Sequence, residues 1–305
     1  MSEHLAVSVR SEIEYLLVSQ AHELLGLPAD AEVQFSRLHP ARNRQHRVRE
    51  FLIASVQGAP RLISKRGTDP HDTKVRRETS VLAGLMQSRS EPGARLIAAG
   101  RDGFVAPYLC DIDLPELWPL LSEARKDQLL DTVVDCMADF HAQVLTTTLI
   151  EPSRSFASAA VAGAPLGPIH GDLGPWNVRC SNSADRVAFV DWEDFHFDGP
   201  QAFDVLNLLL TMSIVEFPDF RQRGFEWLYS TVFIEPTAAS RILRRGLLRY
   251  AEARSTDPEL ILAHVPLFCR YMIDRIEEEQ RSTGNFYYRY FEQTFKLSDV
   301  GSLFR

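Results

Sequence analysis

The sequence lacks the features that mark several broad classes of protein. Its four cysteines include no pair at CxxC spacing, so neither a zinc site nor a disulfide framework is indicated and a reducing compartment is expected. Basic residues are not in excess: the formal net charge is −8, whereas a nucleic-acid partner requires a basic face. No apolar run reaches membrane length, and the first residues lack the basic start and apolar core of a signal peptide. We therefore expect a cytoplasmic globular protein that neither inserts into membranes nor binds nucleic acid.

Residues 1–110 predict a small unit in which a helix precedes a set of strands. The helix covers residues 10–25, where leucine and isoleucine recur at helical spacing, and it ends at Gly26 and Pro28. A second helix is expected over about 72–86, with Val75, Thr79, Leu82 and Met86 on one face. Strands rich in apolar residues are expected at 31–38, 48–56, 61–66, 94–100 and 103–109, the last two joined by a hairpin turn.

Residues 111–305 form a second predicted domain, in which helices dominate. Residues 111–119 have the composition of a linker, and 155–168 that of a loop. A helix is expected from Ser122, because apolar residues follow a 3.6-residue period at Leu129, Leu130, Val133, Val134, Met137, Phe140 and Val144. Two short apolar strands flank a polar loop between 169 and 190, and four or five helical segments follow from Ala202.

The strongest chemical signal is the stretch HGDLGPWN at residues 170–177, followed by Asp191-Trp192-Glu193 at the end of a predicted strand. Asp and Asn are also common turn residues that bond their own backbone. Phosphoryl transfer, however, needs a carboxylate to orient the attacking hydroxyl and accept its proton. It also needs the hard oxygen ligands that Mg²⁺ prefers. Two such motifs at this separation favour phosphoryl transfer over isolated turns.

HGDxxxxN followed by a strand and DWE resembles the catalytic and metal-binding loops of the aminoglycoside phosphotransferase and choline kinase family. The resemblance implies that Asp172 is the catalytic base and that Asn177 and Asp191 bind Mg²⁺. Glu193 stands where relatives carry a second acidic group near the metal. The later segment GPQAFDVLNLL is similar to the one whose aspartate, here Asp204, braces the catalytic loop, and MADFHAQ resembles a preceding helix that gives His141 a structural role.

The same resemblance implies an α+β, two-lobed protein-kinase-like fold, with a small β-rich N-terminal lobe that binds the nucleotide and a larger helical C-terminal lobe. In such folds a strand lysine contacts the nucleotide phosphates and is held by a helix glutamate. Lys65 and Glu78 occupy these places. Both residue types are more often solvated surface groups, and Lys74 and Arg66 are alternative cations nearby.

Between the first two strands the sequence has no glycine-rich loop of the kind that covers phosphates in many kinases. Residues 37–49 instead carry five arginines, of which Arg42 and Arg44 are assigned to the nucleotide phosphates. Contact with an anionic acceptor is the other functional interpretation of this segment, and a solvated basic hairpin tip weighs equally against the two.

The predicted activity is Mg²⁺-dependent transfer of the γ-phosphate of ATP to a hydroxyl of a small molecule, with a lean toward a sugar or glycoconjugate. The lean rests on aromatic and arginine content; Asp274, residues 277–279 and the aromatic segment 285–295 are uncommitted acceptor determinants. Alternatives are a nucleotide-binding pseudokinase scaffold and a kinase for an amino alcohol, an aminoglycoside or a protein. A metal-dependent hydrolase is disfavoured because the histidines are scattered, and the oligomeric state is left open.

Overall fold

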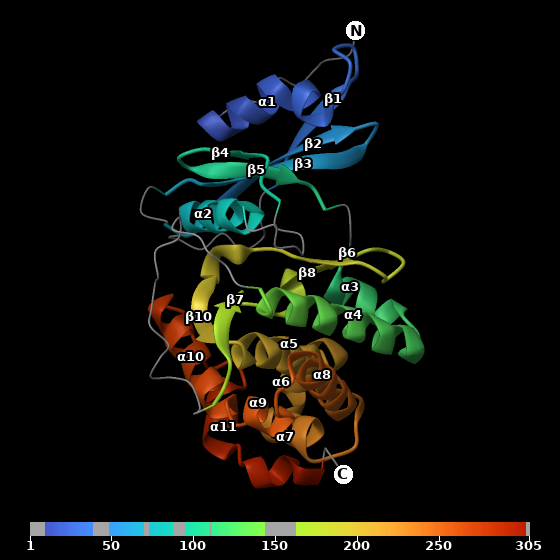
Figure 1. Cartoon of the computed structure of the whole chain (residues 1–305), viewed down its shortest axis with the longest axis vertical. Helices are drawn as coiled ribbons and strands as arrows, with labels where there is room; N and C mark the ends of the chain where they lie inside the picture. Colours follow the sequence, from blue (N-terminus) through green and yellow to red (C-terminus); the bar gives the residue numbers. More distant parts are fainter. Residues whose placement is uncertain are drawn as a thin grey trace. The chain divides into compact units, whose positions relative to one another are not determined.

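A computed structural model describes residues 10–38, 49–69, 73–87, 95–109, 112–143 and 163–302 of the chain. The chain divides into two compact units. The described residues of the first unit are those up to Leu109 together with the short segment Asp191–Asp194, and the other described residues, from Ile112 onward, form the second. The segment that starts at Asp191 therefore belongs structurally with residues far earlier in the sequence. Figure 1 labels the elements of both units.

The first unit is built on an antiparallel sheet with the strand order β1-β2-β3-β5-β4 (Figure 1). Gln57 and Gly58 both have positive φ, the geometry that a tight two-residue hairpin between β2 and β3 requires. The predicted strand at 94–100 is reduced to two residues. The strands are β1 (Val33–Leu38), β2 (Arg49–Val56), β3 (Ala59–Gly67), β4 (Ala98–Ala99) and β5 (Gly103–Pro107).

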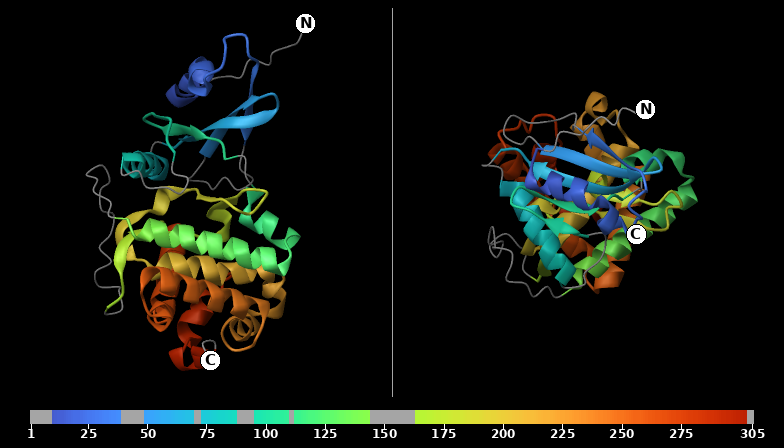
Figure 2. Two further views of the ribbon diagram at one scale, coloured as in Figure 1. Left: turned by 45° about the vertical axis from the view of Figure 1, so that its right-hand side comes forward. Right: turned by 90° about the horizontal axis from the view of Figure 1, so that it is seen from above.

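Helix α1 (Glu12–Leu25) lies across one face of this sheet, as both views of Figure 2 show. The side chain of Ser11 accepts a hydrogen bond from the amide of Glu14, and Gly26 ends the helix in the left-handed conformation. Ile13 and Leu17 are fully buried in a cluster with apolar residues of β2, β3 and β5. The helix predicted from leucine spacing is thereby confirmed.

An ionic cluster fastens α1 to the sheet beside this apolar contact. The carboxylate of Glu14 is fully buried and pairs with Arg37 of β1 and Arg66 of β3. Glu50 of β2 pairs with both arginines as well. Burial alone would raise the pKa of Glu14, but hydrogen bonds from Arg37 and from the Arg10 amide lower it below its ordinary value. Arg37, which the sequence grouped with a basic loop, is thus occupied in holding α1.

Helix α2 (Thr73–Gln87) contacts β3 and β5 and lies on the face of the sheet opposite α1 (Figure 1). Because side chains alternate along a strand, β3 directs Leu62 toward α1 and Lys65 toward α2. Val75, Thr79 and Leu82 are buried as predicted. Met86 is exposed, so its assignment to the buried face was wrong: it lies in the last turn of α2, where the helix ends.

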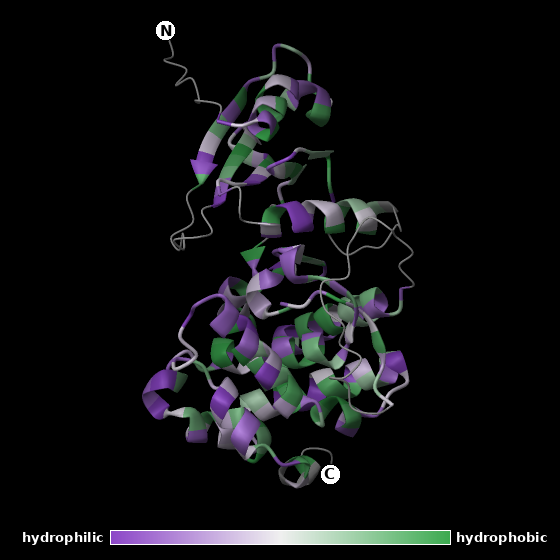
Figure 3. Cartoon of the chain, turned by 90° about the vertical axis from the view of Figure 1, so that its left-hand side faces the viewer, coloured by the Kyte–Doolittle hydropathy of each residue, from purple (hydrophilic) through white to green (hydrophobic). Residues whose placement is uncertain are grey.

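The second unit is mainly helical and is organised around α5 (Ala202–Glu216), whose residues 202–213 are all buried. Helices α4 (Glu123–His141) and α8 (Ala238–Arg254) pack against each other, and α8 also packs on α5. A Cβ on Gly246 would lie 2.3 Å from Leu209, so the close approach of α8 to α5 depends on this glycine. The predicted stripe of α4 is buried from Leu129 to Phe140, and Val144 lies outside the described residues. Figure 3 shows hydrophobic residues concentrated where these helices pack.

The remaining helices of this unit are α6 (Phe220–Arg223), α7 (Phe225–Phe233), α9 (Pro258–Leu262), α10 (Val265–Glu278) and α11 (Tyr288–Thr294). Two small antiparallel sheets precede α5: β7 pairs with β10, and β8 lies between β6 and β9. Their bounds are β6 (Ile112–Asp113), β7 (Leu166–Ile169), β8 (Val178–Cys180), β9 (Val187–Phe189) and β10 (His196–Pro200). Within the described residues, no helix has both the length and the apolar character needed to cross a membrane.

The interpretation of residues 111–119 as a linker was wrong. The segment contains β6, the short helix α3 (Leu114–Leu117) and the start of a 3-10 turn at Trp118–Leu120. Leu114, Leu117 and Trp118 are buried. Proline at the first turn of a helix is tolerated, because the amide it lacks would have no partner there, so the two prolines of this segment, Pro115 and Pro119, were not a sign of a loop.

Candidate active site

A buried lysine in the first unit is surrounded by carboxylates from two segments distant in sequence. Lys65 of β3 lies 2.6 Å from the Glu78 carboxylate of α2 and 2.6 Å from Asp191 Oδ1. Glu193 Oε2 lies 4.0 Å from the same Nζ. Asp191 adopts a positive φ of 66°, a conformation that is uncommon for a residue with a side chain. The turn that follows β9 thereby brings the carboxylates of Asp191 and Glu193 toward Lys65.

The charges of this cluster perturb one another strongly. Burial alone would lower the pKa of Lys65, but the charges of Asp191 and Glu78 raise it above its ordinary value. Lys65 is therefore an ammonium ion. Burial and the neighbouring charge of Asp191 raise the pKa of Glu193 to about 7. Lys65 alone therefore balances only part of the negative charge of Glu78, Asp191 and Glu193.

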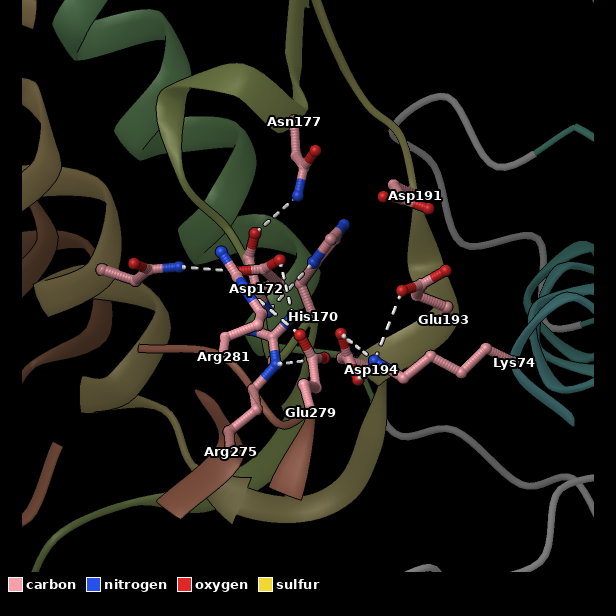
Figure 4. A network of polar contacts seen from close by, with 12 residues as sticks. Lys74, His170, Asp172, Asn177, Asp191, Glu193, Asp194, Arg275, Glu279 and Arg281 are labelled. Atoms are coloured by element: carbon pink, nitrogen blue, oxygen red, sulfur yellow. Dashed lines mark hydrogen bonds and ion pairs between the residues drawn. The ribbon is translucent and has the colours of Figure 1, made fainter. Parts of the chain in front are cut away.

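Two further cations, Arg49 and Lys74, reach the same acidic turn. Arg49 is the first residue of β2, and its Nη2 lies 2.6 Å from Glu193 Oε2. Lys74, at the start of α2, lies 2.9 Å from Asp194 Oδ1 and 3.4 Å from Glu193 Oε1 (Figure 4). The sequence marked Arg49 only as the end of a basic stretch and Lys74 only as an alternative to Lys65. The pairing became visible once strand β2 and the turn after β9 were placed.

Glu78, Asp191 and Glu193 meet the geometric requirement for holding a cation. One carboxylate oxygen from each lies within 4.8 Å of the others. All three are hard oxygen donors, the ligand type that Mg²⁺ selects. Glu78 was predicted as the partner of Lys65, and the structure places it in this donor set as well.

In the second unit, the segment after β7 is held by a buried aspartate of α5. Asp204 Oδ2 accepts a hydrogen bond from the His170 amide at 2.6 Å, and Oδ1 accepts one from the Gly171 amide at 2.9 Å. Gly171 has a φ of 82°, which glycine adopts without strain. His141 Nε2 lies 3.1 Å from Asp204 Oδ2, so the bracing role of Asp204 and the structural role of His141 are confirmed.

Asp172 and Asn177 lie on this braced loop. The Asn177 side-chain amide donates to the backbone carbonyl of Asp172 at 2.8 Å and so fixes the spacing of the two residues. The carboxylate of Asp172 accepts a hydrogen bond from Arg275 of α10, with Nη2 2.8 Å from Oδ2 (Figure 4). Its side chain is 31% exposed, enough for a reactant to reach it. Arg275 was not singled out from the sequence, because only packing of α10 in this unit places it beside a loop about a hundred residues earlier.

The predicted site residues thus fall into three groups. Lys65, Glu78, Asp191 and Glu193 come together in the first unit. Asp172 and Asn177 come together in the second. Arg42 and Arg44 lie outside the described residues.

Residues 113–240 match the model of the phosphotransferase enzyme family. The resemblance to aminoglycoside phosphotransferases and choline kinases is confirmed. With it the enzyme class is a phosphotransferase that uses an alcohol group of a small molecule as acceptor. Among curated proteins, none matches the chain in sequence.

Solved structures of phosphotransferases and kinases show the fold of this chain. The ADP-bound aminoglycoside phosphotransferase APH(2'')-Ib is 12% identical, with a TM-score of 0.55 over 95% of this chain and 96% of the other. An ethanolamine kinase of Plasmodium vivax is 12% identical, with a TM-score of 0.53 over 95% and 86%. A macrolide 2'-phosphotransferase of Brachybacterium faecium is 12% identical, with a TM-score of 0.52 over 94% and 98%. The predicted α+β protein-kinase-like fold is confirmed.

Proposed function

We propose that this protein transfers the γ-phosphate of ATP to a hydroxyl of a small molecule, with Mg²⁺, and that Asp172 is the catalytic base. Lys65, held by Glu78, would bind the phosphates of the nucleotide. Asn177, Asp191 and Glu193 would hold the metal. ATP is the donor we favour because structural neighbours are described as complexes with ADP or with ATP and streptomycin.

The observation that carries this proposal is the environment of Lys65. A buried ammonium held between carboxylates of α2 and of the Asp191 turn costs desolvation energy, which a purely structural site would avoid with apolar residues. The same ammonium is well suited to a triphosphate, whose charge it partly neutralises. We therefore interpret the cluster as a nucleotide site in which the carboxylates hold the Lys65 ammonium in position before the nucleotide binds.

A divalent cation fits the acidic side of the cluster. Asp191 and Glu193, which with Glu78 place one carboxylate oxygen each within 4.8 Å of one another, would supply carboxylates to one ion. The charge of Asp191 raises the pKa of Glu193, and a cation bound between them would relieve this repulsion. Mg²⁺ usually takes one or two protein carboxylates and completes its coordination with phosphate and water. When bound it would neutralise charge on the transferring phosphoryl group; the residues of this chain position that group.

Asp172 has the surroundings expected of a group that contacts the acceptor. Two backbone amides bonded to Asp204 fix the loop on which it lies, and its carboxylate is partly exposed. A carboxylate held this rigidly orients an attacking hydroxyl and accepts its proton. The lean toward a sugar or glycoconjugate rests on the aromatic and arginine content of the chain.

The decisive experiment replaces Asp172 with asparagine. Asp172→Asn should lower phosphoryl transfer by ~10²–10⁴-fold while binding nucleotide as the parent does, because general-base assistance is worth about that much. Release of ADP is measured with a panel of hydroxyl compounds that includes sugars, aminoglycosides and amino alcohols, and nucleotide affinity by fluorescent-analogue titration.

The matched control is Asp198→Asn, which alters an exposed carboxylate of β10 in the same unit. It should leave both measurements unchanged. Near-parental turnover by Asp172→Asn would remove Asp172 from the mechanism. Nucleotide binding without transfer by the parent, over the whole panel, would favour a scaffold.

A further inference from the structure

The carboxylate proposed as the base is paired with a guanidinium. Arg275 of α10 donates from Nη2 to Asp172 Oδ2 at 2.8 Å, and its side chain is only 14% exposed. This charge-assisted hydrogen bond engages Oδ2, one of the two carboxylate oxygens of Asp172, so the guanidinium lies directly beside the group proposed to accept the proton of an attacking hydroxyl. An acceptor that reacts at Asp172 must therefore meet Arg275 as well.

The next charges along this network are a covered carboxylate and an exposed guanidinium. Glu279 lies 3.8 Å from Arg275 and 3.1 Å from Arg281, and its side chain is 5% exposed. The Arg281 side chain is 33% exposed. The network Asp172, Arg275, Glu279, Arg281 (Figure 4) is balanced in formal charge, but the carboxylate of Glu279 is shielded and the guanidinium of Arg281 faces solvent.

Two of the acidic residues that the sequence offered as determinants for a cation, Glu277 and Glu279, are paired with arginines. Glu277 bonds Arg289, and Glu279 bonds Arg281. A cationic acceptor would bring a like charge toward Arg275. An anionic acceptor meets guanidinium groups that are already positioned.

We propose that the acceptor carries an anionic group, a carboxylate or a phosphate, close to its reacting hydroxyl, and that Arg275 binds this group. This rests on the proposed function and names the substrate class of the same site. The acceptor anion replaces Asp172 Oδ2 as the partner of Arg275. Oδ2 of Asp172 is then released to accept the hydroxyl proton, whereas without the acceptor the ion pair keeps this oxygen engaged and slows the activation of water.

The transfer step makes one bond and breaks one. The acceptor hydroxyl oxygen forms a bond to the γ-phosphorus, and the bond between that phosphorus and the β,γ-bridging oxygen breaks. The electron pair of the broken bond leaves with ADP, and the hydroxyl proton passes to Asp172 Oδ2. Arg275 takes no part in bond making; it holds the acceptor anion and thereby sets the position of the hydroxyl.

The test is a binding comparison over two matched sets of probes. One set is glucose, glucosamine, glucuronate and glucose 6-phosphate, and the other is glycerol, glycerate and glycerol 3-phosphate. Affinity is measured by calorimetry with Mg²⁺ and a non-hydrolysable ATP analogue present, so that the nucleotide site is filled. The parent should bind at least one anionic member of a set about tenfold or more tighter than its neutral member, and glucosamine no better than glucose.

Arg275→Gln should abolish this preference, and Arg275→Lys, which keeps the charge but not the planar fork, should weaken it. Background ATP hydrolysis should rise in Arg275→Gln because the restraint on Asp172 is lost. The matched control is Arg270→Gln, on the same helix but paired with Glu292 and 57% exposed, which should behave as the parent. If the acceptor carries a carboxylate, glucuronate or glycerate should bind more tightly than the phosphorylated probe of its set. If it carries a phosphate, glucose 6-phosphate or glycerol 3-phosphate should bind more tightly.

A parent that does not distinguish anionic from neutral probes overturns the proposal, as does an Arg275→Gln protein that still distinguishes them. Failure of the proposed function gives a different result. If Asp172 is not the base, Asp172→Asn retains phosphoryl transfer, while Arg275→Gln still abolishes the preference for anionic probes. The two proposals are thus separated by the residue whose replacement changes binding.

Discussion

Asp191 shows how a single residue combines backbone strain with charge. Its positive φ costs free energy for a residue with a side chain, and its carboxylate lies 2.6 Å from a buried lysine and 3.9 Å from Arg49. Strain of this kind persists only where surrounding contacts fix it, and it is frequent at sites that bind or react.

We predict that substitution of Asp191 weakens the effect of Mg²⁺ on ATP binding. Asp191→Asn should reduce the Mg²⁺-dependent tightening of ATP binding by roughly 10–100-fold, because one charged contact to the ion is worth about 1.5–3 kcal/mol. Nucleotide affinity is titrated with and without Mg²⁺. Asp198→Asn serves again as control, and an Asp191→Asn protein whose response to Mg²⁺ equals that of the parent would show that Asp191 is not a ligand.

At the scale of elements, the position of Lys65 depends on how closely two strands approach. Gly103 of β5 pairs with Arg66 of β3, and a Cβ on Gly103 would lie 2.1 Å from the Lys65 carbonyl oxygen. Backbone cannot yield as the end of a flexible side chain can. The glycine therefore lets β3 and β5 pair at the point where the strand carries Lys65 toward α2.

Gly103→Ala should lower the free energy of unfolding by about 1–3 kcal/mol and weaken ATP binding, because β3 must shift to admit the methyl group. Denaturant unfolding and nucleotide titration measure the two effects. Gly100→Ala, in the same hairpin, is the matched control: its Cβ would meet only Ile13 and Asp102 side chains at ordinary contact distances of 3.5–3.7 Å. Equal effects of the two substitutions would contradict the proposed steric cause.

At the scale of the whole molecule, buried histidines link stability to pH. His141 is fully enclosed between Asp204 and Tyr250. Burial lowers its pKa below the ordinary value, and the hydrogen bond with Asp204 opposes that shift without cancelling it. The folded protein thus keeps His141 neutral at a pH where the unfolded chain binds a proton. Burial also lowers the pKa of His264.

The sign of the effect follows from this difference. The contribution of His141 to the free energy of unfolding is complete above 6.5, the pKa of the side chain in the unfolded state. It falls as the pH drops below this value, because the unfolded state then binds more protons. Between about pH 8 and pH 5.5 the loss attributable to His141 is at most about 1.4 kcal/mol. Free energies of unfolding are compared at both pH values. His141→Gln should lose less stability than the parent over this range, the remaining change being due in part to His264; an identical change in both would exclude His141 as its source.

The sequence by itself determined the helices with clear periodicity and the chemical motifs. Leucine spacing and Gly26 defined α1, and the stripe from Leu129 to Phe140 defined α4, because local geometry alone sets these patterns. The spacing of Asp172, Asn177 and Asp191 likewise signalled phosphoryl transfer. The burial of residues 114–118 was not foreseen, because proline there suits the first turn of a helix as well as a loop.

Only the tertiary structure decided which charges meet. Arg37 proved to hold α1, Arg49 and Lys74 to reach the turn after β9, and Arg275 to bond Asp172. An arginine or lysine on a strand or helix looks the same in sequence whether it faces water or a carboxylate. Its partner is set by pairing and packing of segments that lie tens to more than a hundred residues apart, and no local pattern records that choice.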